Sequence, residues 1–375
     1  MQNLLLTGGT GVLGSRLLLQ MLKEYKDTHF YVLVRGREDI SASERLIQSL
    51  AVYDPQKEFL KEGFKQRVHI VEGSLVHERF SLSDTLYKDL ANKIDRVFHL
   101  AASTSLMAPY EKIKKTNVDG TQKIIDFCLS EKNKPLSYVS SFSVLGDKIF
   151  EAGFRFTEKD FDVGQGFDGS GYQQSKFLAE GLVRGTQADL RWKIFRPGQI
   201  YGDSQSGLYP FQLNTAGGFF YDFFSTVIKT QVAPMTDWLF DMSPVDYVAG
   251  GILKISKEID NDRGTYHLNN SNSLSLKEIF KLFVQLGHPL NFVDLKKYIE
   301  LVRQGLIKAN GQVFESLSLK TISKYLKFSP KAAFNMFAHS AVTECNYTEE
   351  ILKNLGLESP AIDKRLMALY LNKSS

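Results

Sequence analysis

Short apolar runs rich in β-branched and aromatic residues alternate with amphipathic helical patterns through the first half of the chain. This alternation is typical of a parallel sheet with helices on both faces. The expected strands are Leu4–Leu6, Phe30–Val34, Val68–Val71, Val97–Leu100, Leu136–Ser141 and Trp192–Phe195. We therefore predict an α/β fold with a Rossmann-like, doubly wound parallel sheet.

The alternation stops after Asp203, where an aromatic-rich stretch begins. Its aromatic residues suit either a lobe core or a substrate channel, and the core is the more common use. They are Tyr209, Phe211, Phe219, Phe220, Tyr221, Phe223, Phe224, Trp238 and Phe240. We expect a nucleotide-binding domain over 1–203, with returning segments near 241–270, and a smaller, mostly helical C-terminal substrate lobe over 204–375.

Two local patterns predict helices. Apolar residues at helical spacing indicate one helix over roughly 110–130. The run Ser275-Leu276-Lys277-Glu278 is a capping-box pattern, and Gly287 suits the end of the helix that follows it.

A glycine-rich turn directly follows the first expected strand. Backbone N–H groups in such a turn, at the start of a helix, bind a dinucleotide pyrophosphate, although glycines also serve tight turns with no ligand. The candidate cofactor-binding residues are Gly8, Thr10, Gly11, Val12, Leu13 and Gly14.

Tyr172 and Lys176 are four residues apart, which places both on one face of a helix. The Lys176 ammonium could then stabilise the Tyr172 phenolate and make the phenol a usable acid. This spacing alone is common on amphipathic helices. The spacing becomes informative because Ser141 ends an expected strand about 30 residues earlier. A strand-end hydroxyl, a tyrosine and a lysine are the parts that a carbonyl reductase needs, so Ser141, Tyr172 and Lys176 are the predicted catalytic residues.

Arginines follow the second expected strand, where the charge selects between the two nicotinamide dinucleotides. An acidic residue there would bind the ribose 2′-OH of NADH, whereas arginine would bind the 2′-phosphate of NADPH. Arg35 stands at this point and Arg45 on the next helix is a second candidate, which favours NADPH. The alternative is that these arginines are only solvated.

Composition narrows the class of protein further. The chain has 375 residues, 43% of them hydrophobic, and a formal net charge of +4, which gives no argument for a nucleic-acid partner. Its two cysteines cannot form a disulfide framework or a cysteine-rich metal site. We see no signal-peptide pattern and no membrane-length apolar stretch, so we expect no membrane association and a cytoplasmic location.

Several motifs together resemble the extended short-chain dehydrogenase/reductase superfamily. The resemblance is closest to its thioester reductase branch, found as terminal domains of nonribosomal peptide synthetases and carboxylic acid reductases and related to fatty acyl-CoA reductases. Besides the glycine-rich turn and the Tyr172–Lys176 segment, it rests on residues 99–102, 109–111, 117–121, 138–141, 196–202 and 346–363. The resemblance and the strand-end positions add Ser74, Leu75, Ala101, Ala102, Asn117, Pro197, Gly198 and Ile200 to the expected cofactor site, which Tyr172 and Lys176 also join.

The resemblance implies NADPH-dependent reduction of an acyl thioester to an aldehyde, and on to an alcohol if a second hydride is transferred. The substrate would arrive on a carrier protein or on CoA. Two positions depart from the family pattern: Ser74 stands where an aspartate is frequent and Ser105 where an asparagine is frequent. The alternatives are a dehydrogenase or epimerase acting on a sugar nucleotide or small ketone, and a non-catalytic NADPH-binding regulator.

A basic segment in the second half suggests how a carrier could dock. Between residues 291 and 331, lysines and arginines outnumber acidic residues by five. Carrier proteins are typically acidic, so this segment could steer them, although solvated helix faces explain the same charges.

Overall fold

The computed structural model describes residues 2–61, 63–105, 108–146, 148, 150–151, 153–167, 170–186, 189–210, 218–316, 318–320, 322–323 and 342–374. Its centre is a seven-stranded sheet in the order β12-β7-β5-β4-β1-β2-β3, in which every neighbouring pair is parallel. The strands are β1 (Gln2–Thr7), β2 (Thr28–Val34), β3 (Val68–Glu72), β4 (Arg96–His99), β5 (Leu136–Val139), β7 (Trp192–Pro197) and β12 (Arg263–Leu268). The predicted Rossmann-like α/β sheet is confirmed.

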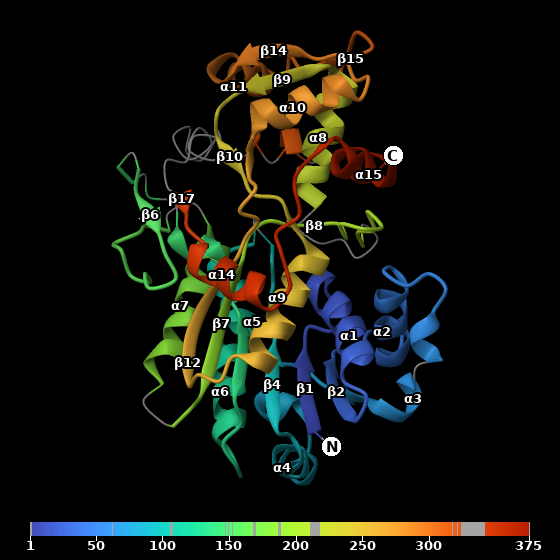
Figure 1. The fold of residues 1–375 in the computed structure, drawn as a ribbon, viewed down its shortest axis with the longest axis vertical. Coiled ribbons are helices and arrows are strands. Elements are labelled where there is room, and N and C mark those ends of the chain that lie inside the picture. The colour runs from blue at the N-terminus through green and yellow to red at the C-terminus, as the bar shows by residue number, and fades with distance from the viewer. Residues whose placement is uncertain are drawn as a thin grey trace.

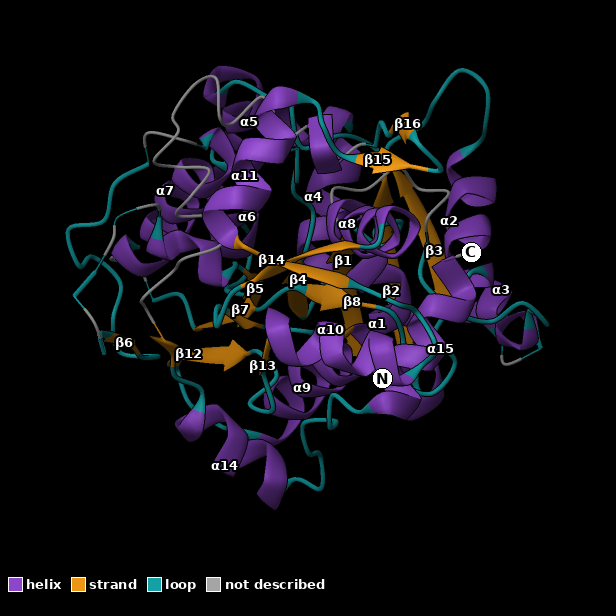
Figure 2. Ribbon diagram, turned by 90° about the horizontal axis from the view of Figure 1, so that it is seen from above, coloured by secondary structure: helices purple, strands orange, loops and turns teal. Residues whose placement is uncertain are grey.

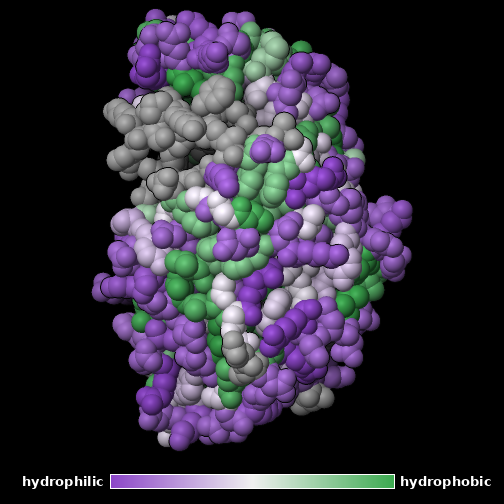
Figure 3. All heavy atoms as spheres, turned by 90° about the vertical axis from the view of Figure 1, so that its left-hand side faces the viewer, coloured by the Kyte–Doolittle hydropathy of each residue, from purple (hydrophilic) through white to green (hydrophobic). Residues whose placement is uncertain are grey.

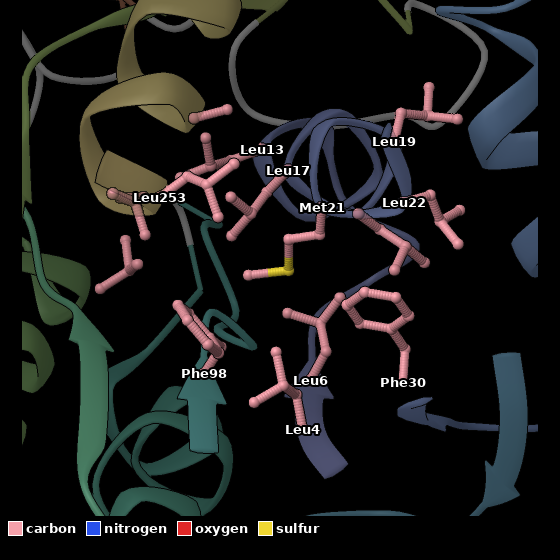
Figure 4. Close-up of a cluster of buried hydrophobic side chains, with 14 of the residues drawn as sticks. Leu4, Leu6, Leu13, Leu17, Leu19, Met21, Leu22, Phe30, Phe98 and Leu253 are labelled. Atoms are coloured by element: carbon pink, nitrogen blue, oxygen red, sulfur yellow. The ribbon is translucent and has the colours of Figure 1, made fainter. Parts of the chain in front are cut away.

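Alternate residues of β1 enter different cores, because successive strand side chains point to opposite faces. Leu4 and Leu6 join the cluster formed with α1 (Val12–Glu24), α2 (Ala42–Ala51) and α9 (Val245–Glu258). Leu5 joins the opposite cluster, formed with α4 (Asp84–Lys93), α6 (Asp119–Leu129) and α7 (Gly171–Gly185). Figure 4 shows the first of these clusters, where leucines of α1 and Met21 lie over β1 and β4.

The helix expected over 110–130 is two helices, α5 (Tyr110–Asn117) and α6. Val118, at the break, has φ −93° and ψ −60°. The Thr121 hydroxyl donates to the Asn117 carbonyl at 2.6 Å, so a side chain satisfies a backbone group at the break.

An upper lobe stands over the carboxyl ends of the sheet (Figures 1 and 2). Its elements are α8 (Gly218–Thr230), β9 (Val232–Met235), β10 (Leu239–Phe240), β13 (Leu274–Ser275), α10 (Leu276–Gln285), β14 (Asn291–Asp294), α11 (Leu295–Gln304), β15 (Lys308–Ala309), β16 (Gln312–Val313) and α15 (Lys364–Ser374). The predicted capping box of Ser275 and Glu278 is present, and α10 ends at Gln285, just before Gly287.

The aromatic stretch forms the core of this lobe. Buried members of the cluster are Tyr209, Phe219, Tyr221, Phe223, Phe224 and Phe240, and Phe220 and Trp238 pack against it half-buried. The core interpretation is therefore confirmed for these residues, whereas Phe211 lies outside the described residues.

Further short elements lie outside the central sheet and the core of the upper lobe. Parallel pairs join β8 (Ile200–Tyr201) to β11 (Ser243–Pro244) and β6 (Arg155–Phe156) to β17 (Val342–Thr343). The remaining elements are α3 (Phe64–Arg67), α14 (Asn346–Asn354) and the 3₁₀ turns Glu58–Leu60, Glu78–Ser81 and Phe142–Leu145. α14 packs against α9 and β12, so part of the C-terminal region lies on the central sheet.

The face seen in Figure 3 carries mainly hydrophilic residues with hydrophobic ones scattered among them. Among the described residues, no helix has both the length and the apolar character needed to cross a membrane.

Candidate active site

A cleft of about 700 Å³ opens at the carboxyl ends of the strands. All predicted site residues except Asn117 line it: Gly8, Thr10, Gly11, Val12, Leu13, Gly14, Arg35, Arg45, Ser74, Leu75, Ala101, Ala102, Ser141, Tyr172, Lys176, Pro197, Gly198 and Ile200. The topology brings them together because parallel strands end at one edge of the sheet.

The glycine-rich turn runs from the end of β1 into α1. Gly8 has φ +78°, and a Cβ there would lie 2.7 Å from the Ala101 backbone nitrogen. At Gly14 a Cβ would lie 2.1 Å from the Gly8 carbonyl oxygen. The turn is closed by a 2.9 Å hydrogen bond from Gly11 N–H to that same oxygen. The geometry thus requires glycine and brings α1 against the turn, as a pyrophosphate cradle does.

Buried polar groups fix this turn to the end of β4. The Thr7 hydroxyl and His99 Nδ1 are 2.7 Å apart, and Thr7 Oγ1 also accepts from Ala101 N–H at 3.2 Å. Burial, together with the nearby Lys176 charge, lowers the pKa of His99 to about 3. His99 is therefore neutral at physiological pH and serves as a structural hydrogen-bonding group.

Three arginines gather at one end of the cleft. Arg45 donates to the backbone carbonyl of Arg35, and its pKa is lowered by burial and then by the charges of Arg37 and Arg35. The carboxylate of Glu72 lies beside Gly36, because a Cβ on Gly36 would be 2.2 Å from Glu72 Oε1. Arg35 and Arg45 line the cleft and Glu72 does not. This end of the cleft is therefore suited to an anion.

Three hydroxyls meet at the other end of the cleft. Ser141 begins the 3₁₀ turn that follows β5, and its Oγ accepts from Ser143 Oγ at 2.7 Å and from Ser143 N–H at 3.2 Å. Tyr172 lies in the first turn of α7, half-buried. Burial raises the pKa of Tyr172, while hydrogen bonds with Ser141 and Ser143 act in the opposite direction. Ser141, Ser143 and Tyr172 therefore form one group of interacting hydroxyls beside the end of β5.

Lys176 lies one turn further along α7 and is buried. Its ammonium donates to Tyr138 Oη at 3.0 Å and to the Val139 carbonyl at 2.8 Å. Burial lowers the pKa of Lys176 to about 7, although the charge of Glu180 opposes this shift. We expected Lys176 to lower the Tyr172 pKa; in this structure its ammonium bonds two groups of β5 instead, and burial raises the pKa of Tyr172.

Asn117 lies outside the cleft lining and holds the cleft wall together instead. Its Oδ1 accepts from Ser103 N–H at 2.7 Å, and its Nδ2 donates to the Ser103 carbonyl at 3.0 Å and to Ser175 Oγ at 2.9 Å. The Ser175 hydroxyl in turn donates to the Tyr172 carbonyl at 2.7 Å. Asn117 therefore connects the loop after β4 to the helical turn that carries Tyr172.

Sequence reasoning missed several groups at the site. Ser143 was not selected, although it lies two residues after the predicted Ser141. Lys112 and Thr116 also line the cleft, and their i,i+4 spacing on an expected helix could have indicated this. The contact of Tyr138 with Lys176 depends on strand packing, so no local pattern indicates it. No group of three or more potential metal ligands occurs among the described residues.

Comparison with known proteins gives a consistent picture. The family model described as male sterility protein matches residues 6–252. The chain is 28% identical over 372 residues to a linear gramicidin synthase polypeptide of Brevibacillus parabrevis, covering 99% of this chain and 7% of that protein. It is 32% identical over 257 residues to the L-2-aminoadipate reductase large subunit of Penicillium chrysogenum, covering 65% of this chain and 18% of that protein. The chain thus spans less than a third of the length of these curated relatives.

Solved structures agree with this result. The terminal R domain from the myxalamid PKS-NRPS biosynthetic pathway superposes with a TM-score of 0.84 at 27% identity, covering 100% of this chain and 90% of that one. A UDP-glucuronic acid 4-epimerase from Bacillus cereus, in complex with NAD, shares the fold with a TM-score of 0.57 at 18% identity, covering 78% and 88% of the two chains. The matching family model is one of NAD-binding domains, which indicates a nicotinamide cofactor. Because the family model covers more than half of the chain, the chain belongs to the male sterility protein family, within the thioester reductase branch of the extended short-chain dehydrogenase/reductase superfamily.

Proposed function

We propose that this chain is an NADPH-dependent reductase that converts an acyl thioester to an aldehyde, and to an alcohol if a second hydride follows. The observation that carries the proposal is a single cleft lined by the glycine turn, by Arg35 and Arg45, and by the hydroxyls of Ser141 and Tyr172. A binding site for a dinucleotide and a set of proton donors thus share one space.

The preference for NADPH is supported by the arginine cluster. Arg35 is exposed at the end of β2, and Arg45 lines the cleft beside it. Guanidinium groups bind a phosphate through charge-assisted hydrogen bonds, and a 2′-phosphate distinguishes NADPH from NADH. We assign Gly8, Thr10, Gly11, Val12, Leu13 and Gly14 to the pyrophosphate, and Ser74, Leu75, Ala101, Ala102, Pro197, Gly198 and Ile200 to the walls of the cofactor site.

When bound, the nicotinamide ring supplies a hydride to the thioester carbon. Ser141 and Tyr172 would donate hydrogen bonds to the carbonyl oxygen as negative charge develops there. Ser143 holds the Ser141 oxygen so that the Ser141 proton can point to the substrate. Transfer of a proton to the oxygen gives a hemithioacetal, which collapses to aldehyde and thiol. Lys176 would hold the ribose beside the nicotinamide, close to Val139 and Tyr138.

The proposed substrate is a thioester on a carrier protein, with a CoA thioester as the second source of the same group. A related structure is described as a thiolation-reductase di-domain from an archaeal non-ribosomal peptide synthetase. In the basic segment, Lys297 pairs with Glu300 and Lys320 with Glu315, so these two lysines already have acidic partners within the segment. Lys324, Lys327 and Lys331 lie outside the described residues.

The alternative enzyme acts on a sugar nucleotide or small ketone, and the second alternative is a regulator that binds NADPH without catalysis. The likeness to the epimerase concerns the fold alone. A regulator would have no use for the convergent Ser141, Ser143 and Tyr172 hydroxyls.

One experiment separates these candidates. Oxidation of NADPH is followed with an acyl thioester on a carrier protein, the same acyl-CoA, a sugar nucleotide, and no substrate. We expect thioester-dependent oxidation with aldehyde formation, and slower oxidation with NADH. Turnover of the sugar nucleotide alone, or cofactor binding without any turnover, would contradict the proposal.

A further inference from the structure

A buried acidic residue, Glu180, lies directly behind the proposed catalytic set. It is one turn beyond Lys176 on α7, and neither its side chain nor that of Arg196 has exposed surface. Arg196 donates to both Glu180 oxygens, from Nη2 at 2.6 Å and from Nε at 3.1 Å. Arg184 adds a third ion-pair contact at 2.8 Å. A carboxylate without exposed surface must be compensated by such contacts.

The fourth contact of the Glu180 carboxylate is with the residue that follows β5. The Ser140 hydroxyl donates to Glu180 Oε2 at 2.6 Å, and Ser140 directly precedes Ser141. Arg196 directly precedes Pro197, which lines the cofactor cleft. One carboxylate is therefore bonded to the ends of both β5 and β7 and lies on the helix that carries Tyr172 and Lys176.

We propose that Glu180 is a positioning residue of this reductase: it holds the Ser140–Ser141 strand end against α7 and supplies the negative charge that keeps the Lys176 ammonium protonated. This inference rests on the proposed function, because it assigns Ser141 and Lys176 to that site. Ion pairing with Arg196 and Arg184 alone would stabilise the fold. The bond to Ser140 and the position next to Lys176 extend its effect to the cleft.

Glu180 is the acidic group whose charge raises the pKa of Lys176, and the other titratable groups beside Lys176 are neutral. On β4, His99 is neutral because its pKa is about 3. On β5, Tyr138 is a neutral phenol whose pKa is raised well above its ordinary value by burial. On α7, the pKa of Tyr172 is also raised. Burial lowers the pKa of Lys176 to about 7, and the carboxylate of Glu180 opposes that shift.

The first test replaces Glu180 by an isosteric neutral group. Glu180→Gln removes a charge one helical turn from Lys176 and leaves the Arg196 charge uncompensated, so both changes disfavour the ammonium. We expect the pKa of Lys176 to fall by about one unit or more. It is read from the ¹³Cε chemical shift of labelled lysine, assigned with Lys176→Met, which requires no turnover. The descending limb of the kcat–pH profile should move to lower pH by the same amount.

Asp203→Asn is the matched control, because it breaks the ion pair of Asp203 with Arg16, a pair that is also mostly buried. It should lower stability without moving the Lys176 titration. An unchanged Lys176 pKa in Glu180→Gln, or the same shift in Asp203→Asn, would overturn the electrostatic role. If the wild-type chain reduces no thioester, the proposed function fails, whereas the chemical-shift titration still decides the role of Glu180.

Ser140→Ala tests the strand contact while the ion pair stays intact, which also covers the case that Glu180→Gln does not fold. Ser137→Ala is its control, since Ser137 is a buried serine of the same strand that bonds Ser256 instead. We expect Ser140→Ala to lower kcat about 10-fold with the Lys176 pKa and the cofactor Kd unchanged, and Ser137→Ala to leave kcat within about twofold. Equal kcat values for the two variants would refute the positioning of Ser141 through Ser140.

Discussion

Replacement of Gly8 by alanine tests the cofactor turn most sharply. Gly8 adopts φ +78°, which costs an alanine about 1 kcal/mol through unfavourable backbone sterics. The added Cβ would also lie 2.7 Å from Ala101 N and 2.8 Å from the Leu100 carbonyl carbon. Both neighbours are backbone atoms at the end of β4, so the turn itself must move by several tenths of an ångström to restore ordinary contact.

Such a movement acts on the N–H groups that would bind the pyrophosphate. A hydrogen bond to a charged group contributes about 1.5–3 kcal/mol. Loss of one to two of these bonds weakens NADPH by about 3 kcal/mol, which is roughly two orders of magnitude in Kd. The Kd is measured by isothermal titration calorimetry, and the free energy of unfolding by urea denaturation.

Gly356→Ala provides the matched control. Gly356 has φ +70°, and a Cβ there meets no atom within 4 Å. This variant should lose about 1 kcal/mol of stability, because alanine is less favourable than glycine at a positive φ. It should bind NADPH as the wild type does. If Gly8→Ala retained wild-type affinity, or if both variants lost affinity equally, the glycine turn would not be the pyrophosphate site.

Two further predictions concern residues of the cleft, and a third concerns Asp241, a buried carboxyl group that is not in the cleft lining. Tyr172→Phe should lower kcat by about 10²-fold and leave the NADPH Kd within about twofold, because it removes the proton donor and keeps the aromatic ring that lines the cleft. Stopped-flow oxidation of NADPH with most of the rate retained would disprove this role. Arg35→Asp should raise the Kd of NADPH by about 10²-fold and that of NADH only a few-fold, since it replaces a phosphate partner by a repelling charge; equal losses would show a structural role for Arg35. Burial raises the pKa of Asp241 to about 6, so the protonated form is favoured in the folded state and this group lowers stability as pH rises from about 4 to above 6. The free energy of unfolding of Asp241→Asn, measured by urea denaturation, should therefore rise by about 2–3 kcal/mol relative to that of the wild type as the pH goes from 4 to 7. A difference between the two proteins that does not change with pH would contradict the pKa shift.

The central strands of the sheet were predictable because they are largely buried on both faces and read as apolar runs between turn signals. The edge strand β12, whose sequence begins Arg263-Gly264-Thr265, carries no such run and was not among the expected strands. The cleft was predictable for a related reason: once the strands are parallel, residues at their carboxyl ends must meet. Gly8, Ser141 and Pro197 are far apart in sequence and line the same cleft.

Side-chain partners were less predictable, because they depend on packing between distant segments. Asn117 was expected to bind the cofactor and instead bonds Ser103 and Ser175. Lys176 was expected to act on Tyr172 and instead donates to Tyr138 and Val139. The helix break at Val118 also gave no local sequence signal, since neither proline nor glycine stands at that position.

The origin of the hydrogen in the product tests the central claim most directly. NADPH carrying deuterium at the transferable C4 position is incubated with the chain and a carrier-bound acyl thioester, and the released product is examined by mass spectrometry. The account predicts an aldehyde with one deuterium, or an alcohol with two, at the former thioester carbon, formed only when NADPH is oxidised. An unlabelled product, or release of free acid with no oxidation of NADPH, would contradict it.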